Sequence, residues 1–290
     1  MGSTALVLGG GGPVGGGWMT GVLAGLCDAG VDPVRADVVI GTSAGAIFGS
    51  RLLAGESARE LYERQLAGAD GVDLRVTPAQ TLRFLWAALG ARDPERSVRR
   101  LGRAALKART GPESDVYDAL GPLLRGVRDW PGRGLRITAV DALSGQLTAF
   151  GADSGISFLE AIAASCAVPV VWPPVTAAGR RWMDGGSRST ANIHLACGHG
   201  HVLAIAPIPT AVGPHSSAGQ QAATLTAEGA HVTLVTPDHA ARRAMGRDMT
   251  SDARRPAAAR AGHAQATALA GSVHEVWRDE RRRPAGTTQA

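Results

Sequence analysis

The first fifty residues contain an apolar run, a glycine turn and a helical pattern in that order two times. This alternation constrains the fold more than any other feature of the sequence. Residues 4–8 form a short apolar run that ends in a glycine-rich turn over residues 9–17 and leads into a helical pattern. A second apolar run at residues 37–40 ends in a glycine turn at residues 41–45 and leads into a helix from about residue 44 to 53. Strands that alternate with helices in this way predict a parallel sheet covered by helices.

Further apolar runs predict the remainder of this sheet. Strands are expected at residues 135–140, 201–206 and 231–236, and a hairpin is expected from residues 170–176 and 180–183. A helix over residues 157–166 precedes the hairpin. The alternation of these elements predicts an α/β fold with a mainly parallel central sheet.

Residues 56–127 show helical patterns only, which indicates a helical cap inserted between two strands of the sheet. Within the cap, Leu82, Leu85, Trp86 and Leu89 form an apolar stripe at helical spacing, and we expect it to pack on the core rather than to contact lipid. The sequence shows no internal repeat and no linker of low complexity. We therefore expect one domain over residues 1–290, with a basic helical tail from about 239 to 290.

The amino-acid composition is typical of a folded globular protein. Hydrophobic residues make up 44% of the chain and charged residues 19%, which allows a sizeable core. No apolar run approaches the roughly 18 residues of a membrane span. The first residues lack a basic segment, and three cysteines are too few for a disulfide framework. These features predict a cytoplasmic protein with reduced thiols.

The net charge of +5 prompts the question of a nucleic-acid partner. Residues 239–290 carry ten arginines against five acidic residues, so this segment accounts for the whole excess and the rest of the chain sums to zero. Aromatic residues make up only 4%, too few for the stacking positions of a single-strand binder. We expect no nucleic-acid binding, and instead a peripheral contact between the basic tail and an anionic membrane surface.

The second glycine turn, Gly41-Thr42-Ser43-Ala44-Gly45, fits the G-x-S-x-G pattern of a nucleophile elbow. A serine between a strand and a helix lies on a sharp turn, where side chains at Gly41 and Gly45 would collide with the backbone. Ser43 then stands exposed at a helix N-terminus, which favours developing negative charge. The pattern predicts Ser43 as a nucleophile rather than an ordinary helix cap.

The first glycine turn allows two interpretations. Consecutive glycines at Gly10, Gly11 and Gly12 let several backbone N–H groups point in one direction, as an oxyanion hole requires. The same turn matches G-x-G-x-x-G and predicts a nucleotide-binding module as the alternative. A dinucleotide site needs an acidic residue at the end of the second strand, where this chain has Ile40 and the serine turn. The oxyanion hole is therefore the preferred interpretation.

A serine nucleophile needs a base, and Asp184 is the preferred candidate. It follows a predicted hairpin strand and precedes two glycines that allow close backbone approach. All eight histidines lie at or after position 194, so a Ser-His-Asp α/β-hydrolase remains an alternative, although only two strands precede Ser43. The spacing of His194, Cys197, His199 and His201 matches no zinc pattern, and no metal site is expected.

Four groups of residues together resemble the patatin-like phospholipase family, in its bacterial form. They are the glycine run at residues 9–15, the turn at residues 41–45, the segment Ala163–Pro169 with Pro173-Pro174-Val175, and Asp184-Gly185-Gly186. Their order and spacing agree with the family from about residue 4 to about residue 207. Residues 51–130 resemble only a variable helical cap.

The resemblance implies a three-layer α/β/α sandwich and a Ser–Asp dyad without a catalytic histidine. Ser43 would be the nucleophile, Asp184 the base, and the amides of Gly10, Gly11 and Gly12 the oxyanion hole. Members of the family hydrolyse ester bonds of phospholipids, lysophospholipids or neutral lipids. The resemblance therefore implies a lipid or acyl-ester substrate and no metal or organic cofactor.

The chain departs from the family at two positions of the glycine run. Val14 stands where the family often has arginine or lysine, and Gly9 stands where an aspartate often opens the run. Without the positive charge, attraction to a phosphate headgroup is weaker. A neutral ester or a lysolipid is therefore the expected substrate.

Overall fold

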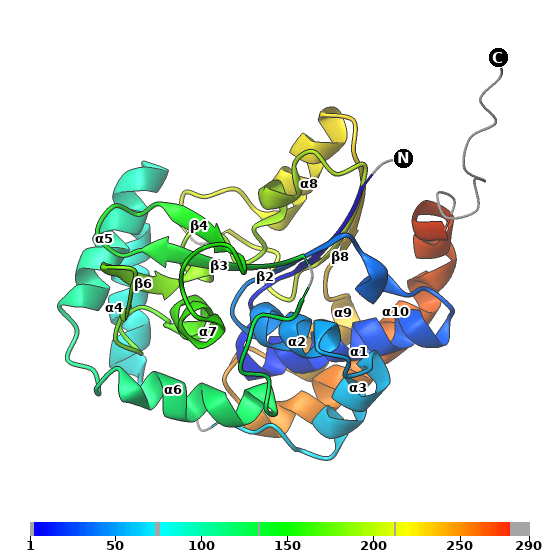
Figure 1. Ribbon diagram of the computed structural model, residues 1–290, viewed down its shortest axis with the longest axis horizontal. Helices are drawn as coiled ribbons and strands as arrows, with labels where there is room; N and C mark the ends of the chain where they lie inside the picture. The colour runs from blue at the N-terminus through cyan, green and yellow to red at the C-terminus, as the bar shows by residue number, and fades with distance from the viewer. Residues whose placement is uncertain (1–2, 73–75, 133, 212, 279–290) are drawn as a thin grey trace.

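The computed structural model describes residues 3–72, 76–132, 134–211 and 213–278. Within these residues, eight strands form one sheet in the order β5-β6-β3-β2-β1-β7-β8, and β4 pairs with β3 off this path (Figure 1). The strands are β1 (Thr4–Leu8), β2 (Val38–Gly41), β3 (Leu135–Asp141), β4 (Leu147–Phe150), β5 (Val175–Ala177), β6 (Arg180–Asp184), β7 (His201–Ile205) and β8 (His231–Val235).

Five strands, β3, β2, β1, β7 and β8, are parallel neighbours, whereas β4, β5 and β6 pair antiparallel. The predicted mainly parallel sheet is confirmed. The hairpin strand expected at residues 170–176 begins only at Val175. Pro169, Pro173 and Pro174 precede it, and proline cannot donate to a strand ladder, which explains the shorter strand.

Helices cover both faces of the sheet and give the predicted three layers. They are α1 (Gly12–Asp28), α2 (Ala44–Leu53), α3 (Ala58–Leu66), α4 (Pro78–Leu89), α5 (Pro94–Leu106), α6 (Ser114–Leu120), α7 (Phe158–Cys166), α8 (Ala218–Ala227), α9 (His239–Met245) and α10 (Arg255–Arg278). Figure 1 shows α1, α2 and α7 on one face and α8 on the other.

The central strand β1 explains why both faces need a cover. Leu6 and Leu8 belong to the core cluster shared with α1, α2 and α7, whereas Ala5 and Val7 belong to the cluster shared with α8. A parallel strand buried on both faces reads as a continuous apolar run, as residues 5–8 do. The chain also reverses direction across the sheet at β1, because β2 lies on one side and β7 on the other. In open α/β sheets, ligands bind outside the carboxyl ends of the strands at such a reversal.

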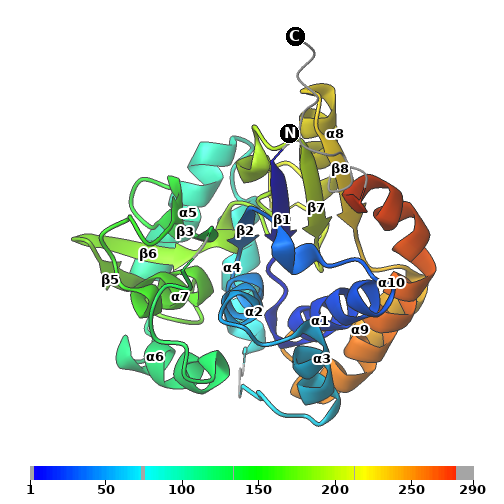
Figure 2. The same ribbon diagram turned by 45° about the vertical axis from the view of Figure 1, so that its right-hand side comes forward.

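The predicted basic tail is in part a packed element of the fold. α10 lies alongside α1 (Figure 2), and added Cβ atoms at Gly21 and Gly25 would collide with the carbonyls of Ala259 and His263. Glycines at this spacing thus allow the two helices to approach closely. The α10 portion of residues 239–290 therefore contributes to the core, while residues 279–290 lie outside the described part of the chain.

The structure contradicts the expected packing of the apolar stripe on α4. Leu82, Leu85, Trp86 and Leu89 are exposed, whereas Ala87 and Ala88 on the opposite side of the helix are buried. The helical spacing identified the helix correctly but not the face that the rest of the chain covers. Among the described residues, no helix combines the length and the apolar character needed to cross a bilayer.

Candidate active site

Two strands approach the same edge of β3 from opposite ends. β2 runs parallel to β3 and pairs with residues 135–137, whereas β6 runs antiparallel and pairs with residues 139–141. β4 pairs with residues 137–140 and so occupies the other edge, because a strand residue has one neighbour on each side. The carboxyl ends of β2 and β6 therefore face each other across Thr138, and this register brings the chain after Gly41 close to Asp184.

Ser43 lies on the strained turn that the sequence predicts. It is the residue before α2 and has a φ of 52°, a backbone conformation that residues other than glycine rarely adopt. A Cβ at Gly41 would collide with the backbone of Ala46, and a Cβ at Gly45 would collide with the carbonyl of Leu8. Both flanking glycines are therefore required by close backbone contacts.

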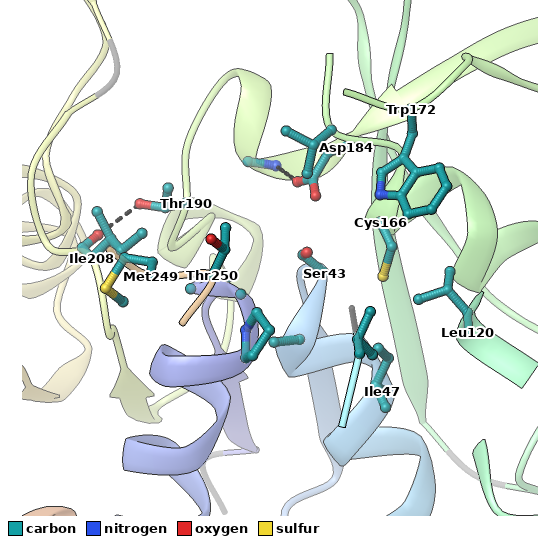
Figure 3. A pocket seen from close by; sticks show the side chains of 18 of the residues that line it. Ser43, Ile47, Leu120, Cys166, Trp172, Asp184, Thr190, Ile208, Met249 and Thr250 are labelled. Atoms are coloured by element: carbon teal, nitrogen blue, oxygen red, sulfur yellow. Dashed lines mark hydrogen bonds between the residues drawn. The ribbon is translucent and has the colours of Figure 1, made fainter. Parts of the chain in front are cut away.

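Asp184 is buried at the end of β6, and its Oδ1 accepts a hydrogen bond of 2.6 Å from the Gly186 N–H. Burial raises the pKa of the carboxyl from an ordinary 3.8 to about 6, although hydrogen bonds from Gly186 and Ser43 oppose the rise. A carboxylate with this pKa is ionised at pH 7 and is a stronger base than an exposed aspartate. Figure 3 shows the side chains of Ser43 and Asp184 pointing toward one another.

The first glycine turn follows β1, beside Ser43, but its three amides are not equivalent. The Gly10 N–H donates a hydrogen bond of 2.7 Å to the carbonyl of Thr190, so the prediction that it belongs to an oxyanion hole is corrected. Gly11 and Gly12 begin α1, where amides lack an intrahelical acceptor. Neither of these two amides has an acceptor among the described residues. They can hold an anion, and the α1 dipole adds to this.

A buried polar network connects the two strand ends. Asn192 Nδ2 donates to Thr42 Oγ1 (3.0 Å), Thr138 Oγ1 (3.3 Å) and the Gly185 carbonyl (3.3 Å), and the two threonine hydroxyls lie 2.8 Å apart. Thr42 precedes Ser43 and Gly185 follows Asp184, so the network holds the turn that carries Ser43 against the turn that carries Asp184. Sequence reasoning missed Asn192. Its φ of 51° is one that asparagine tolerates better than most residues.

Ser43 and Asp184 line one cavity of about 340 Å³. Most of the lining is apolar, and includes Ile47, Leu120, Leu123, Trp172, Ile208 and Met249. Such a lining suits an acyl chain and keeps water from the carboxylate of Asp184. The sequence analysis did not identify these residues, because they come from five separate parts of the chain.

The wall of the cavity also includes Arg255 and Gln65. Arg255 is almost fully buried, and its guanidinium donates to Gln65 Oε1, to the carbonyls of Gly68 and Ala69, and to Asp252. Every nitrogen of the guanidinium therefore already has an acceptor within the chain. Arg255 therefore stabilises the cavity wall, and its positive charge is compensated by acceptors within the chain.

Three further residues near the site have structural roles. Ser165 Oγ accepts a hydrogen bond of 2.9 Å from the Ser43 N–H, which fixes the turn. Burial raises the pKa of the Cys166 thiol, which keeps it protonated. Asp141 accepts from the N–H groups of Leu143 and Ser144, and so shapes a turn away from the cavity.

The structure gives no support to a histidine base. His194 contacts Gln221, His199 contacts the Ala196 carbonyl, and His201 stacks on His231. Within the described part of the chain, no histidine lines the cavity, and no group of three potential metal ligands is found. The nucleotide alternative is also weakened, because the cavity beside the first glycine turn is largely apolar.

The chain is similar to known proteins in its sequence pattern and in its fold. The family model for patatin-like phospholipase matches residues 6–197, and no curated protein sequence matches the chain. VipD from Legionella pneumophila is similar in structure, with 13% identity over 93% of this chain and 67% of VipD and a TM-score of 0.48. The type III effector protein ExoU shows 14% identity over 93% of this chain, with a TM-score of 0.40.

The chain spans about half of ExoU, 53% of its length. The match to the family model covers about two thirds of the present chain and contains both glycine turns, Ser43 and Asp184. The chain therefore belongs to the patatin-like phospholipase family of lipid acyl hydrolases.

Proposed function

We propose that this protein hydrolyses carboxylic esters of lipids through a Ser43–Asp184 dyad. The observation that carries the proposal is the meeting of two strand ends at one apolar cavity, with a serine on one and a buried carboxylate on the other. The raised pKa of Asp184, about 6, supports its role as the base.

In the acylation step, Ser43 Oγ attacks the ester carbonyl and Asp184 accepts the hydroxyl proton. The negative charge develops on the carbonyl oxygen, where the amides of Gly11 and Gly12 donate hydrogen bonds. The proton on Asp184 then passes to the departing alcohol or lysolipid, and the acyl group remains on Ser43. The burial of the carboxylate favours this cycle, because an aspartate with an ordinary pKa is a poor base.

In the deacylation step, Asp184 takes a proton from a water molecule that attacks the acyl-enzyme. The same two amides hold the second oxyanion, and its collapse releases the fatty acid and returns the proton to Ser43. The cycle uses only groups of this chain and needs no metal or organic cofactor.

A neutral ester or a lysolipid is the proposed substrate class. Val14, at the position where the family often carries a cation, is fully buried in the core. Among the described lining residues, Arg255 is the one arginine or lysine, and its guanidinium is already paired. The cavity therefore offers little to a phosphate and much to an acyl chain. We also propose a peripheral contact with a membrane, since the substrate resides there.

Fluorophosphonate labelling tests this proposal. A fluorophosphonate should label wild-type protein on Ser43, as identified by peptide mass spectrometry, and should fail to label Ser43→Ala. Ser187→Ala is the matched control, because Ser187 also lines the cavity but its hydroxyl bonds neither Ser43 nor Asp184; the variant should still be labelled on Ser43. Labelling of a serine other than Ser43 would exclude the proposed dyad. Lipid-class profiling with the active protein should show release of fatty acid from monoacyl or neutral lipids first.

A further inference from the structure

One face of α4 exposes four large apolar side chains in a continuous stripe. Leu82, Leu85, Trp86 and Leu89 are 70%, 45%, 67% and 65% exposed, and each lies three or four residues from another member of the stripe, which places them on one helix face. Single exposed leucines are common on protein surfaces, but four large apolar side chains on one helix face are not. The stripe therefore marks a contact surface rather than incidental exposure.

The surroundings of this stripe are strongly basic. Residues 78–109, which contain α4 and α5, carry eight arginines and lysines against Asp93 and Glu95, a net charge of +6. This net charge exceeds the +5 of the whole chain, so positive charge is concentrated on this segment as well as on the tail. The Arg100 guanidinium lies 3.8 Å above the ring of Trp86, which places positive charge on the stripe itself.

The opposite side of α4 forms part of the cavity wall. Phe84, two residues from Leu82 and Trp86, lines the cavity, as does Val76 just before the helix. Gln80 Nε2 also donates a hydrogen bond of 3.3 Å to the carbonyl of Val170, which ties α4 to the segment that carries Trp172. A surface bound to the exposed side of α4 therefore lies one helix away from the space that receives the acyl chain.

We propose that the exposed stripe of α4, with the basic side chains of α4 and α5 around it, docks on the surface of an anionic lipid bilayer. Amphipathic helices with leucine and tryptophan on one face and arginine around it bind at the level of the headgroups. Arginine stems lie along apolar surface while their charges reach anionic headgroups. The inference rests on the proposed lipid substrate and names the surface through which the enzyme meets it.

Two observations favour a bilayer over a protein partner. The stripe belongs to a helical hairpin with a net charge of +6 and only two acidic residues. This charge complements an anionic surface and repels a second copy of the same hairpin. The stripe also lies on the helix whose opposite side, through Phe84, lines a cavity suited to acyl chains. In the basic tail, by contrast, α10 packs against α1.

Vesicle binding of Ser43→Ala protein tests the proposal without any hydrolysis. Co-sedimentation should be strong with vesicles of phosphatidylcholine and phosphatidylglycerol, and at least about tenfold weaker with phosphatidylcholine alone. Leu82→Gln with Leu89→Gln should lower binding to anionic vesicles by about tenfold or more. Arg83→Gln with Arg92→Gln, both exposed on this hairpin, should lower it by about tenfold or more.

Leu269→Gln is the matched control for the leucine variant. Leu269 is also exposed, at 36%, but it lies on α10 at the other end of the molecule from α4 (Figure 1). Its substitution should leave vesicle binding unchanged. Equal losses in the two leucine variants would overturn the proposal. A concentration-dependent dimer that is abolished by Leu82→Gln with Leu89→Gln, without vesicle binding by the parent, would overturn it in favour of a second copy.

Tryptophan emission places the contact on α4. Anionic vesicles should shift the emission to shorter wavelength, and Trp86→Phe should remove the shift while retaining most of the binding. Retention of the full shift in Trp86→Phe, among the six tryptophans of the chain, would place the contact elsewhere and overturn the proposal.

An activity comparison separates this inference from the proposed function. The Leu82→Gln and Leu89→Gln double variant should hydrolyse a soluble p-nitrophenyl ester within about twofold of wild type, because neither leucine lines the cavity. Its hydrolysis of ester presented in anionic vesicles should fall at least about tenfold. Binding of Ser43→Ala protein without esterase activity in the wild type would refute the enzyme and leave the docking surface standing. Esterase activity that does not depend on the stripe in either assay would do the reverse.

Discussion

The meeting point of β2 and β6 and the α4–α5 hairpin differ in what determines the environment of their side chains. At the strand ends, backbone conformation determines the positions of the side chains, because Ser43 has a positive φ and Gly41 and Gly45 have no room for a Cβ. On α4, helical spacing determines which side chains share a face, but not what covers that face. A site built on backbone constraints can therefore be identified from local sequence, whereas the partner of an amphipathic face cannot.

The largest effect is expected at the strand ends, where two buried aspartates, Asp184 and Asp141, end the neighbouring strands β6 and β3. Asp184→Asn should lower kcat for a soluble ester by about a thousandfold or more, because the amide cannot accept the Ser43 proton. Asp141→Asn is the matched control: Asp141 is also buried and ends β3, but it serves a turn. Its activity should stay within about twofold of wild type.

Comparable activity in Asp184→Asn and wild type would contradict the dyad. Alanine substitution of His194, His199 and His201 would then identify a histidine base if one exists. With the dyad in place, each of these three variants should remain close to wild-type activity.

The same Asp184→Asn variant should be more stable than wild type. Because the folded-state pKa of Asp184 is raised to about 6, the folded protein binds this proton more tightly than the unfolded chain. The free energy of unfolding therefore falls as pH rises from about 4 to about 6, and the charge costs up to about 3 kcal/mol above pH 6. Chemical denaturation should show the gain in Asp184→Asn at pH 7.5 and its loss near pH 4. A gain of equal size at both pH values would show that ionisation is not its cause.

The pH dependence of catalysis should report the same group. The acid limb of kcat/KM for a soluble ester should have its midpoint near pH 6, with about a tenfold fall for each pH unit below it, because the protonated carboxyl is not a base. The Asp141→Asn variant should show the same midpoint. A midpoint near 6 in the residual activity of Asp184→Asn would assign the titration to another group.

Thr138 offers a finer test, since it lies between the two strand ends and acts through its neighbours. Thr138→Val removes the hydroxyl that contacts Thr42 and Asn192 and keeps the shape of the side chain. It should lower kcat about tenfold with little change in KM, because small displacements of reacting groups are costly. Thr138→Ser keeps the hydroxyl and should restore most of the activity. Equal loss in both variants would indicate a packing role instead of a positioning one.

The sequence predicted the parts of the molecule that local chemistry dictates. The bounds of β1 and α2, the turn at Ser43 and the position of Asp184 at a strand end all follow from glycine placement and apolar runs. Asn192 escaped prediction because its role depends on partners 54 and 150 residues away.

Arg255 escaped prediction for the same reason. It contacts Gln65 across 190 residues of sequence, and the tail that contains it was expected to be a surface element. The stripe of α4 was wrongly expected to pack on the core, because periodicity alone does not distinguish a buried apolar face from an exposed one.

Removal of one helix cap should have a small effect on stability, which should differ in extent between α4 and α7. Thr77 and Ser157 form the same capping box at the starts of α4 and α7. Each alanine variant should destabilise its own helix by about 1 kcal/mol. In Thr77→Ala, hydrogen exchange should quicken within α4 while the global free energy of unfolding stays nearly constant, because one face of this helix is uncovered.

In Ser157→Ala the loss should appear in global unfolding, because α7 is buried against the sheet near the ends of β2 and β6. A Thr77→Ala variant that lowers global stability as much as Ser157→Ala would show that α4 unfolds only with the sheet. The hairpin would then be as firmly integrated as the strand ends, and the contrast between the two regions would reduce to exposure alone.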